Sequence, residues 1–280
     1  MRWLIIGLLL VAMPAQAQMP TTLDALKAAA QQEGSLNAVW SDSILGGGDV
    51  AQQHEAKFDA FAGSKIKLKF SPGPEVAREG NILFTELQAG QPASSDIYIG
   101  AAAQVQPLIA GGMFQTISWQ TLLPARITAQ DVERGGQVMR IQTGISGITY
   151  NTDLMPNPPA LIEDYLKPEF RGKIASTPYA GGYDILAAND LWGPAKTLDF
   201  VKKLSPQLAG LMRCGDVERI ATGEFPALVM DCISNSAITW HDRGAPVGFF
   251  IPRDVAQRRY YYIGIPRHAQ HPAAAALFAV

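Results

Sequence analysis

The segment GISGITYN, residues 144–151, decides the fold, because it is an extended run between a helical region and a proline-rich turn. Strands alternate with helices before this segment, and the alternation restarts after it. A second extended run, Arg259 to Pro266, precedes an alanine-rich helix near the end of the chain. The sequence therefore predicts an α/β protein of two lobes that are joined by two extended crossings, near 144–151 and 259–266.

The region before the first crossing begins with a strand–loop–helix unit. Leu36 to Trp40 is predicted as a strand, and Asp49 is a suitable N-cap for the helix that follows the glycine-rich turn. In 65–70, apolar residues alternate with lysines, which is typical of a strand with one wet face. Because strands and helices alternate, we expect a parallel sheet with helices on its faces.

After the first crossing, the predicted elements are a strand at 173–176, a helix at 182–192 and a strand at 227–232. The chain has only two cysteines, Cys214 just before a helix and Cys232 at the end of the next strand. Helix N-termini and strand C-termini share one edge of a parallel sheet, which is also the edge that binds ligands. We therefore expect a disulfide that contributes roughly 3 kcal/mol to stability.

The N-terminal residues are typical of a secretory signal. Arg2 precedes an apolar run over 3–13, and Ala15-Gln16-Ala17 is a cleavage site of the A-x-A type. The run is too short to span a bilayer comfortably, and no second run of sufficient length follows. Residues 1–17 are thus predicted to be a cleaved signal peptide, and the mature chain to lie in a bacterial periplasm.

Composition excludes several classes of protein. Hydrophobic residues make up 48% of the chain and charged residues 17%, so a large core is available and disorder is not expected. The formal net charge of −2 gives no electrostatic reason to bind nucleic acid or an anionic membrane.

The sequence lacks G-x-S-x-G, H-E-x-x-H, C-x-x-C, P-loop and G-x-G-x-x-G signatures. Of its four histidines, His54 falls on an apolar helix face, whereas His268 and His271 have a spacing that suits either a metal site or a solvated helix start. No histidine or aspartate is placed near Ser146, so no enzymatic activity is predicted. A secreted α/β hydrolase remains the alternative from another class.

Six segments in their expected order give a resemblance to a known family: 85–100, GITYNTDL (147–154), 165–179, 218–229, 244–252 and 268–278. The chain resembles the extracellular solute-binding proteins of family 1, especially the branch of the ferric-iron binders. This resemblance implies a type 2 periplasmic-binding-protein fold, with lobe 1 at 18–146 completed by 264–280 and lobe 2 at 147–263. It also implies a monomer that delivers a small polar solute to the membrane permease of an ABC importer.

Ferric iron is the alternative ligand within the same fold. The iron binders carry two adjacent tyrosines shortly after the segment that reads GEFPALVMDC here, but this chain has Ile233, Ser234, Asn235 and Ser236 there. The triplet Tyr260 to Tyr262 comes later, where hinge packing is expected. Since serine and asparagine do not replace a phenolate's charge, neither a metal ion nor a cofactor is predicted.

Loops at the C-terminal ends of the strands should face the cleft. The candidates for solute contact are Ser41, Asp42, Ser43, Arg78 and Gly100 from lobe 1 and Thr177, Tyr179, Tyr183, Arg213, Ser234 and Asn235 from lobe 2. Further candidates in the same loops are Trp40, Ser71, Glu75, Ala101, Asp184 and Gly215. The alternatives are that the serines only satisfy turns, that Arg78 pairs with a neighbouring glutamate, and that the tyrosines pack at the lobe surface.

Overall fold

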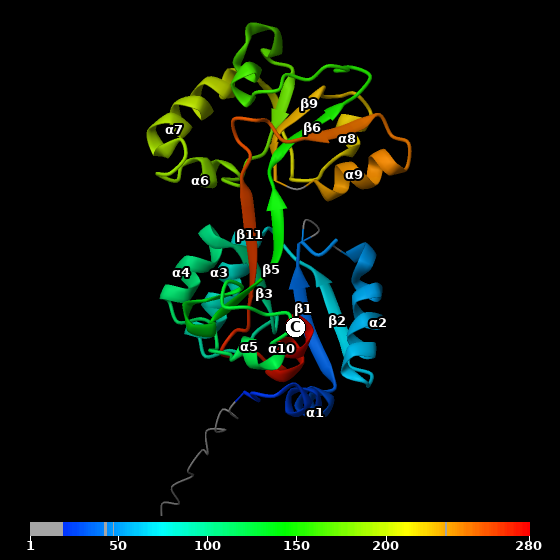
Figure 1. The fold of residues 1–280 in the computed structure, drawn as a ribbon, viewed down its shortest axis with the longest axis vertical. Coiled ribbons are helices and arrows are strands. Elements are labelled where there is room, and N and C mark those ends of the chain that lie inside the picture. The colour runs from blue at the N-terminus through cyan, green and yellow to red at the C-terminus, as the bar shows by residue number, and fades with distance from the viewer. Residues whose placement is uncertain (1–18, 42–43, 47, 233) are drawn as a thin grey trace, which may run out of the picture.

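The computed structural model describes residues 19–41, 44–46, 48–232 and 234–280, so the predicted signal peptide lies outside the described residues. Figure 1 shows two bodies, one above the other, connected by strands that run from one into the other. We call lobe 1 the body with α1–α5 and α10, and lobe 2 the body with β6–β10. The α/β fold class predicted from the sequence is confirmed.

Lobe 1 is built from the two ends of the described chain. Its helices are α1 (Leu23–Glu33), α2 (Ala51–Ala62), α3 (Val76–Gln88), α4 (Ala102–Ala110), α5 (Trp119–Leu122) and α10 (Pro272–Ala279). Its strands are β1 (Ser35–Trp40), β2 (Lys67–Pro72), β3 (Tyr98–Ala101), β4 (Val132–Glu133), β5 (Val138–Ile145) and β11 (Arg258–Gly264). Short 3₁₀ turns occupy Gly48–Val50 and Arg134–Gly136.

The strands of lobe 1 form two sheets. β1 and β2 pair in parallel, as expected. The expectation of a parallel sheet is wrong for β3, which pairs antiparallel with β11 in the order β3-β11-β5-β4. The reason is the return of the chain from lobe 2, because β11 enters lobe 1 beside β3 and runs against it (Figure 1).

Lobe 2 contains β6 (Gly147–Asn151), β7 (Ile174–Ser176), β8 (Leu208–Leu211), β9 (Ala227–Asp231) and β10 (Val247–Phe250) in the order β10-β6-β9-β7-β8. Its helices are α6 (Tyr183–Leu186), α7 (Gly193–Leu204), α8 (Glu218–Ala221) and α9 (Asn235–Asp242), with 3₁₀ turns at Ile162–Leu166, Pro168–Phe170 and Ser205–Gln207. The helix predicted over 182–192 ends early, since Asn189 and Asp190 favour a turn there.

The buried apolar residues fall into separate clusters. The largest joins β1, α2 and α10 in lobe 1, where Ala273 to Leu277 of α10 are buried. A second includes Ile148, Tyr165 and Phe200 and lies within lobe 2. Each lobe therefore buries its own apolar surface. A lobe with a core of its own is expected to move as a unit relative to the other lobe. The lobe boundaries at 146 and 263 stay a prediction.

Asp96 fixes α10 to lobe 1. It is fully buried and accepts hydrogen bonds from the backbone N–H groups of Asn37 (2.8 Å), Gln270 (2.6 Å) and His271 (3.0 Å) and from His271 Nδ1 (2.8 Å). Ser35 Oγ lies 3.0 Å from His271 Nε2. Ser35 begins β1 at the end of lobe 1 away from lobe 2 (Figure 1), so this Ser–His–Asp chain serves docking of α10.

Two absences hold for the described part of the chain. It contains no group of three or more histidine, cysteine, aspartate or glutamate residues that could hold a metal ion. None of its helices has both the length and the apolar character needed to cross a membrane.

Glu79 of α3 gives lobe 1 a pH-dependent stability. It is 6% exposed, and within the described part of the chain its Oε1 has no hydrogen-bond partner. Burial, with a smaller contribution from Glu86, raises its pKa from 4.5 to about 7. The protonated carboxyl is therefore favoured by folding, and its stabilising contribution is present below pH 4.5 and lost as the pH rises through 7.

Glu79→Gln should thus raise the melting temperature at pH 8 relative to the wild type, and by less at pH 5, because the amide mimics the neutral acid. Thermal unfolding followed by circular dichroism at both pH values measures this difference. Glu169→Gln, at an exposed position, is the matched control. The same pH response in both variants would contradict the role of Glu79.

Candidate functional site

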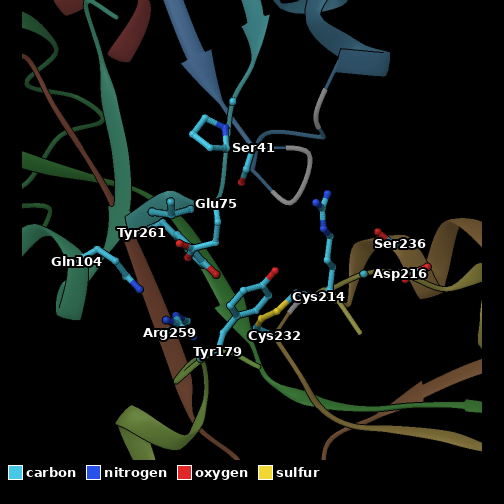
Figure 2. Close-up of a pocket in the computed structure, with 16 residues that line it drawn as sticks. Ser41, Glu75, Gln104, Tyr179, Cys214, Asp216, Cys232, Ser236, Arg259 and Tyr261 are labelled. Atoms are coloured by element: carbon cyan, nitrogen blue, oxygen red, sulfur yellow. A yellow bond between two sulfur atoms is a disulfide. The ribbon is translucent and has the colours of Figure 1, made fainter. Parts of the chain in front are cut away.

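A cleft of about 360 Å³ lies between the lobes. Lobe 1 lines it with Ser41 after β1, Glu75 at the start of α3 and Gln104 of α4. Lobe 2 lines it with Tyr179, Arg213, Asp216 and Ser236, and the crossing strand β11 contributes Arg259 and Tyr261 (Figure 2). The cleft therefore takes its walls from both lobes and from the connection between them.

Of the predicted contact residues, Ser41, Tyr179 and Arg213 line this cleft, as do the further candidates Glu75 and Gly215. Asp42 and Ser43 lie outside the described residues. The other predicted residues are not among those that line it, and they are Arg78, Gly100, Thr177, Tyr183, Ser234 and Asn235. Whether any of the predicted residues touches a solute stays a prediction.

The structure gives several of the remaining residues local roles. Arg78 is exposed on α3, and Gly100 pairs with Tyr262 inside the sheet. Tyr183 lies with its hydroxyl 2.8 Å from Ser176 Oγ, and burial raises its pKa to about 12. Ser234 and Asn235 begin α9 directly before the lining residue Ser236. These positions place most of the set around the cleft rather than on its surface.

The predicted disulfide between Cys214 and Cys232 is confirmed, with their Cα atoms 5.4 Å apart. Both cysteines line the cleft. Asp231 holds the same turn, because its Oδ1 accepts a hydrogen bond of 2.9 Å from the N–H of Gly215. Covalent and hydrogen-bonded restraints therefore fix the loop that presents Arg213.

A β-bulge directs the end of β9 toward the cleft. Ile148 pairs with Val229 and Gly147 with Asp231, which leaves Met230 unpaired with a φ of 60°. A buried non-glycine residue in this left-handed region is uncommon and is found at sites where the backbone is re-aimed. Here the bulge shifts the register just before Asp231 and Cys232.

Lining residues that were not predicted from the sequence include Gln104, Asp216, Ser236, Arg259 and Tyr261. Hinge packing was expected for the triplet Tyr260 to Tyr262, and the contacts of Tyr260 and Tyr262 are in keeping with it. The ring of Tyr260 lies 4.7 Å from the Arg140 guanidinium, and the Tyr262 hydroxyl donates a hydrogen bond of 2.6 Å to Glu133. Strand alternation puts Arg259 and Tyr261 on one face. The two arginines, Arg258 and Arg259, that precede three tyrosines in this crossing were the available signal.

The candidate nucleophile Ser146 does not line the cleft. It is buried, and none of the described residues is a hydrogen-bond partner of its Oγ. His54 contacts the carbonyl oxygen of Leu45, and His241 contacts that of Val247. Neither histidine is hydrogen-bonded to Ser146. Burial raises the pKa of Tyr261, which disfavours the phenolate that ferric iron prefers. The arrangement is suited to binding.

Removal of the disulfide should destabilise lobe 2. Cys214→Ser with Cys232→Ser should lower the free energy of unfolding by about 3 kcal/mol, because the loop between the cysteines loses its restraint in the unfolded chain. Urea denaturation of the oxidised wild type and of the double variant measures the loss. Equal midpoints would show that the bridge does not support this wall of the cleft.

Comparison with known structures shows the same fold in several binding proteins. Iron-bound HitA from Pseudomonas aeruginosa matches with a TM-score of 0.67 and 13% identity over 88% of this chain and 79% of that one. AfuA from Actinobacillus pleuropneumoniae, with exogenous fructose-6-phosphate bound, matches with a TM-score of 0.69 and 18% identity over 87% and 77% of the two chains. A putative spermidine/putrescine ABC transporter protein from Listeria monocytogenes gives 0.65 and 17% over 88% and 77%.

Identities at this level show the fold alone. No curated protein sequence matches the chain significantly. The model of one family, described as bacterial extracellular solute-binding protein, matches residues 50–280. This match includes both crossings, lobe 2 and most of lobe 1. The chain belongs to the bacterial extracellular solute-binding proteins.

Proposed function

We propose that this protein captures a small polar solute in the cleft between its lobes and delivers it, unchanged, to an ABC importer. The observation that carries the proposal is the origin of the cleft walls, which come from lobe 1, lobe 2 and β11. A solute held there touches both lobes at once, and the family supports this role.

The proposed mechanism is closure of the lobes over the solute. Contacts that bridge Glu75 or Gln104 of lobe 1 and Tyr179 or Arg213 of lobe 2 are complete only in a closed form. Binding therefore shifts the population toward that form, by the difference in affinity between the open and closed states. The permease then distinguishes loaded from empty protein by the separation of the lobes.

The proposed location is the periplasm, reached through cleavage of the signal peptide predicted at 1–17. The proposed partner is the membrane permease of an ABC importer, and the protein acts as a monomer with no cofactor and no contact with nucleic acid. The disulfide Cys214–Cys232 supports an oxidising compartment, where such bonds persist.

The solutes named for the structural neighbours include iron and fructose-6-phosphate, so the fold does not choose among them. Iron is the alternative ligand for this chain, with Tyr179, Tyr261 and the carboxylates of Glu75 and Asp216 as the oxygen donors of the cleft. Ferric loading separates the alternatives, because a phenolate–iron complex is coloured whereas a polar organic solute gives no visible band.

Native mass spectrometry of the protein released from a bacterial periplasm tests the proposed function. We expect a 1:1 complex with a small molecule. A solute that is enclosed between the closed lobes dissociates slowly, so it stays bound through purification. After removal of the solute, calorimetry with the recovered compound should restore binding, and the compound should be recovered without chemical change. Turnover of the compound, or no binding to any solute, would contradict the proposal.

Arg213→Gln should weaken this binding several-fold, because Arg213 is a cation at the cleft wall. Arg253→Gln is the matched control, since Arg253 is exposed and does not line the cleft. Equal affinities for the two variants would place the solute elsewhere.

A further inference from the structure

Arg259 is a buried cation at the wall of the cleft. It is 5% exposed and belongs to the crossing strand β11. Its Nη2 donates to Asp184 Oδ2 at 3.4 Å, whereas Nε and Nη1 are buried and have no hydrogen-bond partner among the described residues. Because arginine stays charged in proteins and carries five N–H donors, most of the hydrogen-bonding capacity of a permanent charge is unsatisfied here.

Asp184 is a weak partner for this charge. The contact is at the long limit of a hydrogen bond. Oδ1 of the same carboxylate accepts the N–H groups of Gly182 and Ile185, each at 3.0 Å, which holds the start of α6. Asp184 therefore has a structural role without Arg259, and the described side chains leave the charge of the guanidinium largely uncompensated.

The surroundings hold the guanidinium in place without satisfying it. A Cβ atom at Gly181 would lie 2.5 Å from Arg259 Nη1, so a side chain at this position would displace the guanidinium from where it lies. The ring of Tyr261 lies 5.6 Å from the Arg259 Cζ. In Figure 2, Gln104 and Tyr179 are drawn on either side of Arg259. Gln104 Oε1 is also buried, and no described residue is its hydrogen-bond partner, so a second unsatisfied polar group belongs to the cleft lining.

The other charges of the cleft leave Arg259 available to a ligand. Glu75 accepts a hydrogen bond of 3.1 Å from the N–H of Ala77 and so caps α3. Asp216 is drawn with Ser236 beyond the disulfide from Arg259 in Figure 2. Arg213 adds a second cation to the lining.

We propose that the solute carries an oxyanion, a carboxylate or a phosphate, and that the Arg259 guanidinium binds it. The guanidinium N–H groups match the oxygens of both anions. This inference rests on the proposed function, because it assigns the chemical class of the solute for the same cleft. Since Arg259 pairs through its backbone with Gly144 of β5, the anion is held at the crossing and stays bound while the lobes close around the rest of the solute.

Thermal-shift and calorimetric titrations of the oxidised, solute-free protein test the assignment with matched pairs of probes. The phosphate arm compares glycerol 3-phosphate with glycerol and fructose 6-phosphate with fructose. The carboxylate arm compares succinate with succinamide, and putrescine is the cationic probe. We expect at least one charged member to raise the melting temperature while its neutral partner does not, and the arm that responds identifies the anion.

The variants are Arg259→Gln, Arg259→Lys and the control Arg171→Gln, which removes an exposed arginine outside the cleft lining. We expect Arg259→Gln to weaken binding of the responding anion at least tenfold, Arg259→Lys to weaken it less, and Arg171→Gln to leave it unchanged. The solute-free melting temperature of Arg259→Gln should not fall below that of Arg171→Gln, because the substitution removes an unsatisfied buried charge. Arg259→Lys keeps the charge and tests the proposal if the glutamine variant does not fold.

Three results would overturn the inference. Undiminished anion binding by Arg259→Gln would show that another group holds the anion. A large loss of solute-free stability in that variant, with affinity kept in Arg259→Lys, would show a structural arginine. Binding of only neutral or cationic solutes by the wild type would refute the oxyanion while leaving the proposed function intact, whereas binding of no solute of any class would refute both.

Discussion

The antiparallel pairing of β5 with β11 is the constraint on which the rest of the structure depends. It runs from Arg258 opposite Ile145 to Gly264 opposite Val138, with one register shift between Tyr261 and Tyr262. β5 leaves lobe 1 through this pairing and continues as β6 of lobe 2, and β11 brings the chain back (Figure 1). Because β5 and β11 are paired where they join the lobes, we expect the lobes to move relative to each other by bending of these two strands. The cleft beside the strands then opens and closes at a fixed position in the molecule.

The same connection provides part of the binding surface. Arg259 and Tyr261 project into the cleft from β11, while the bulge at Met230 and the Cys214–Cys232 bridge shape the opposite wall. The cleft thus combines rigid parts, held by covalent and backbone bonds, with an unsatisfied cation. The unsatisfied charge of Arg259 destabilises the folded protein. The two separate cores around Trp40 and Tyr165 offset this cost by burying apolar side chains.

Local patterns in the sequence were sufficient to predict the elements, because capping, periodicity and strand alternation are short-range properties. The order of these elements along the chain was then sufficient to predict the disulfide. The strand at 36–40 and the pairing of Cys214 with Cys232 were predictable in this way. The antiparallel place of β3 was not, because it depends on where the chain returns from lobe 2. For the site, Ser41, Tyr179 and Arg213 followed from the rule for strand ends, whereas Arg259 did not, because it lies inside a crossing strand and the unsatisfied state of its side chain appears only with its neighbours.

Closure of the lobes over a solute is the central claim, and the distance between them tests it most directly. Spin labels on cysteines introduced at Gln53 of α2 and Ile238 of α9, both exposed and in different lobes, report this distance by double electron–electron resonance while the native cysteines remain bridged. The account predicts a broad distribution without solute that becomes shorter and narrower when the co-purified compound is added. The same distribution with and without bound compound would contradict it.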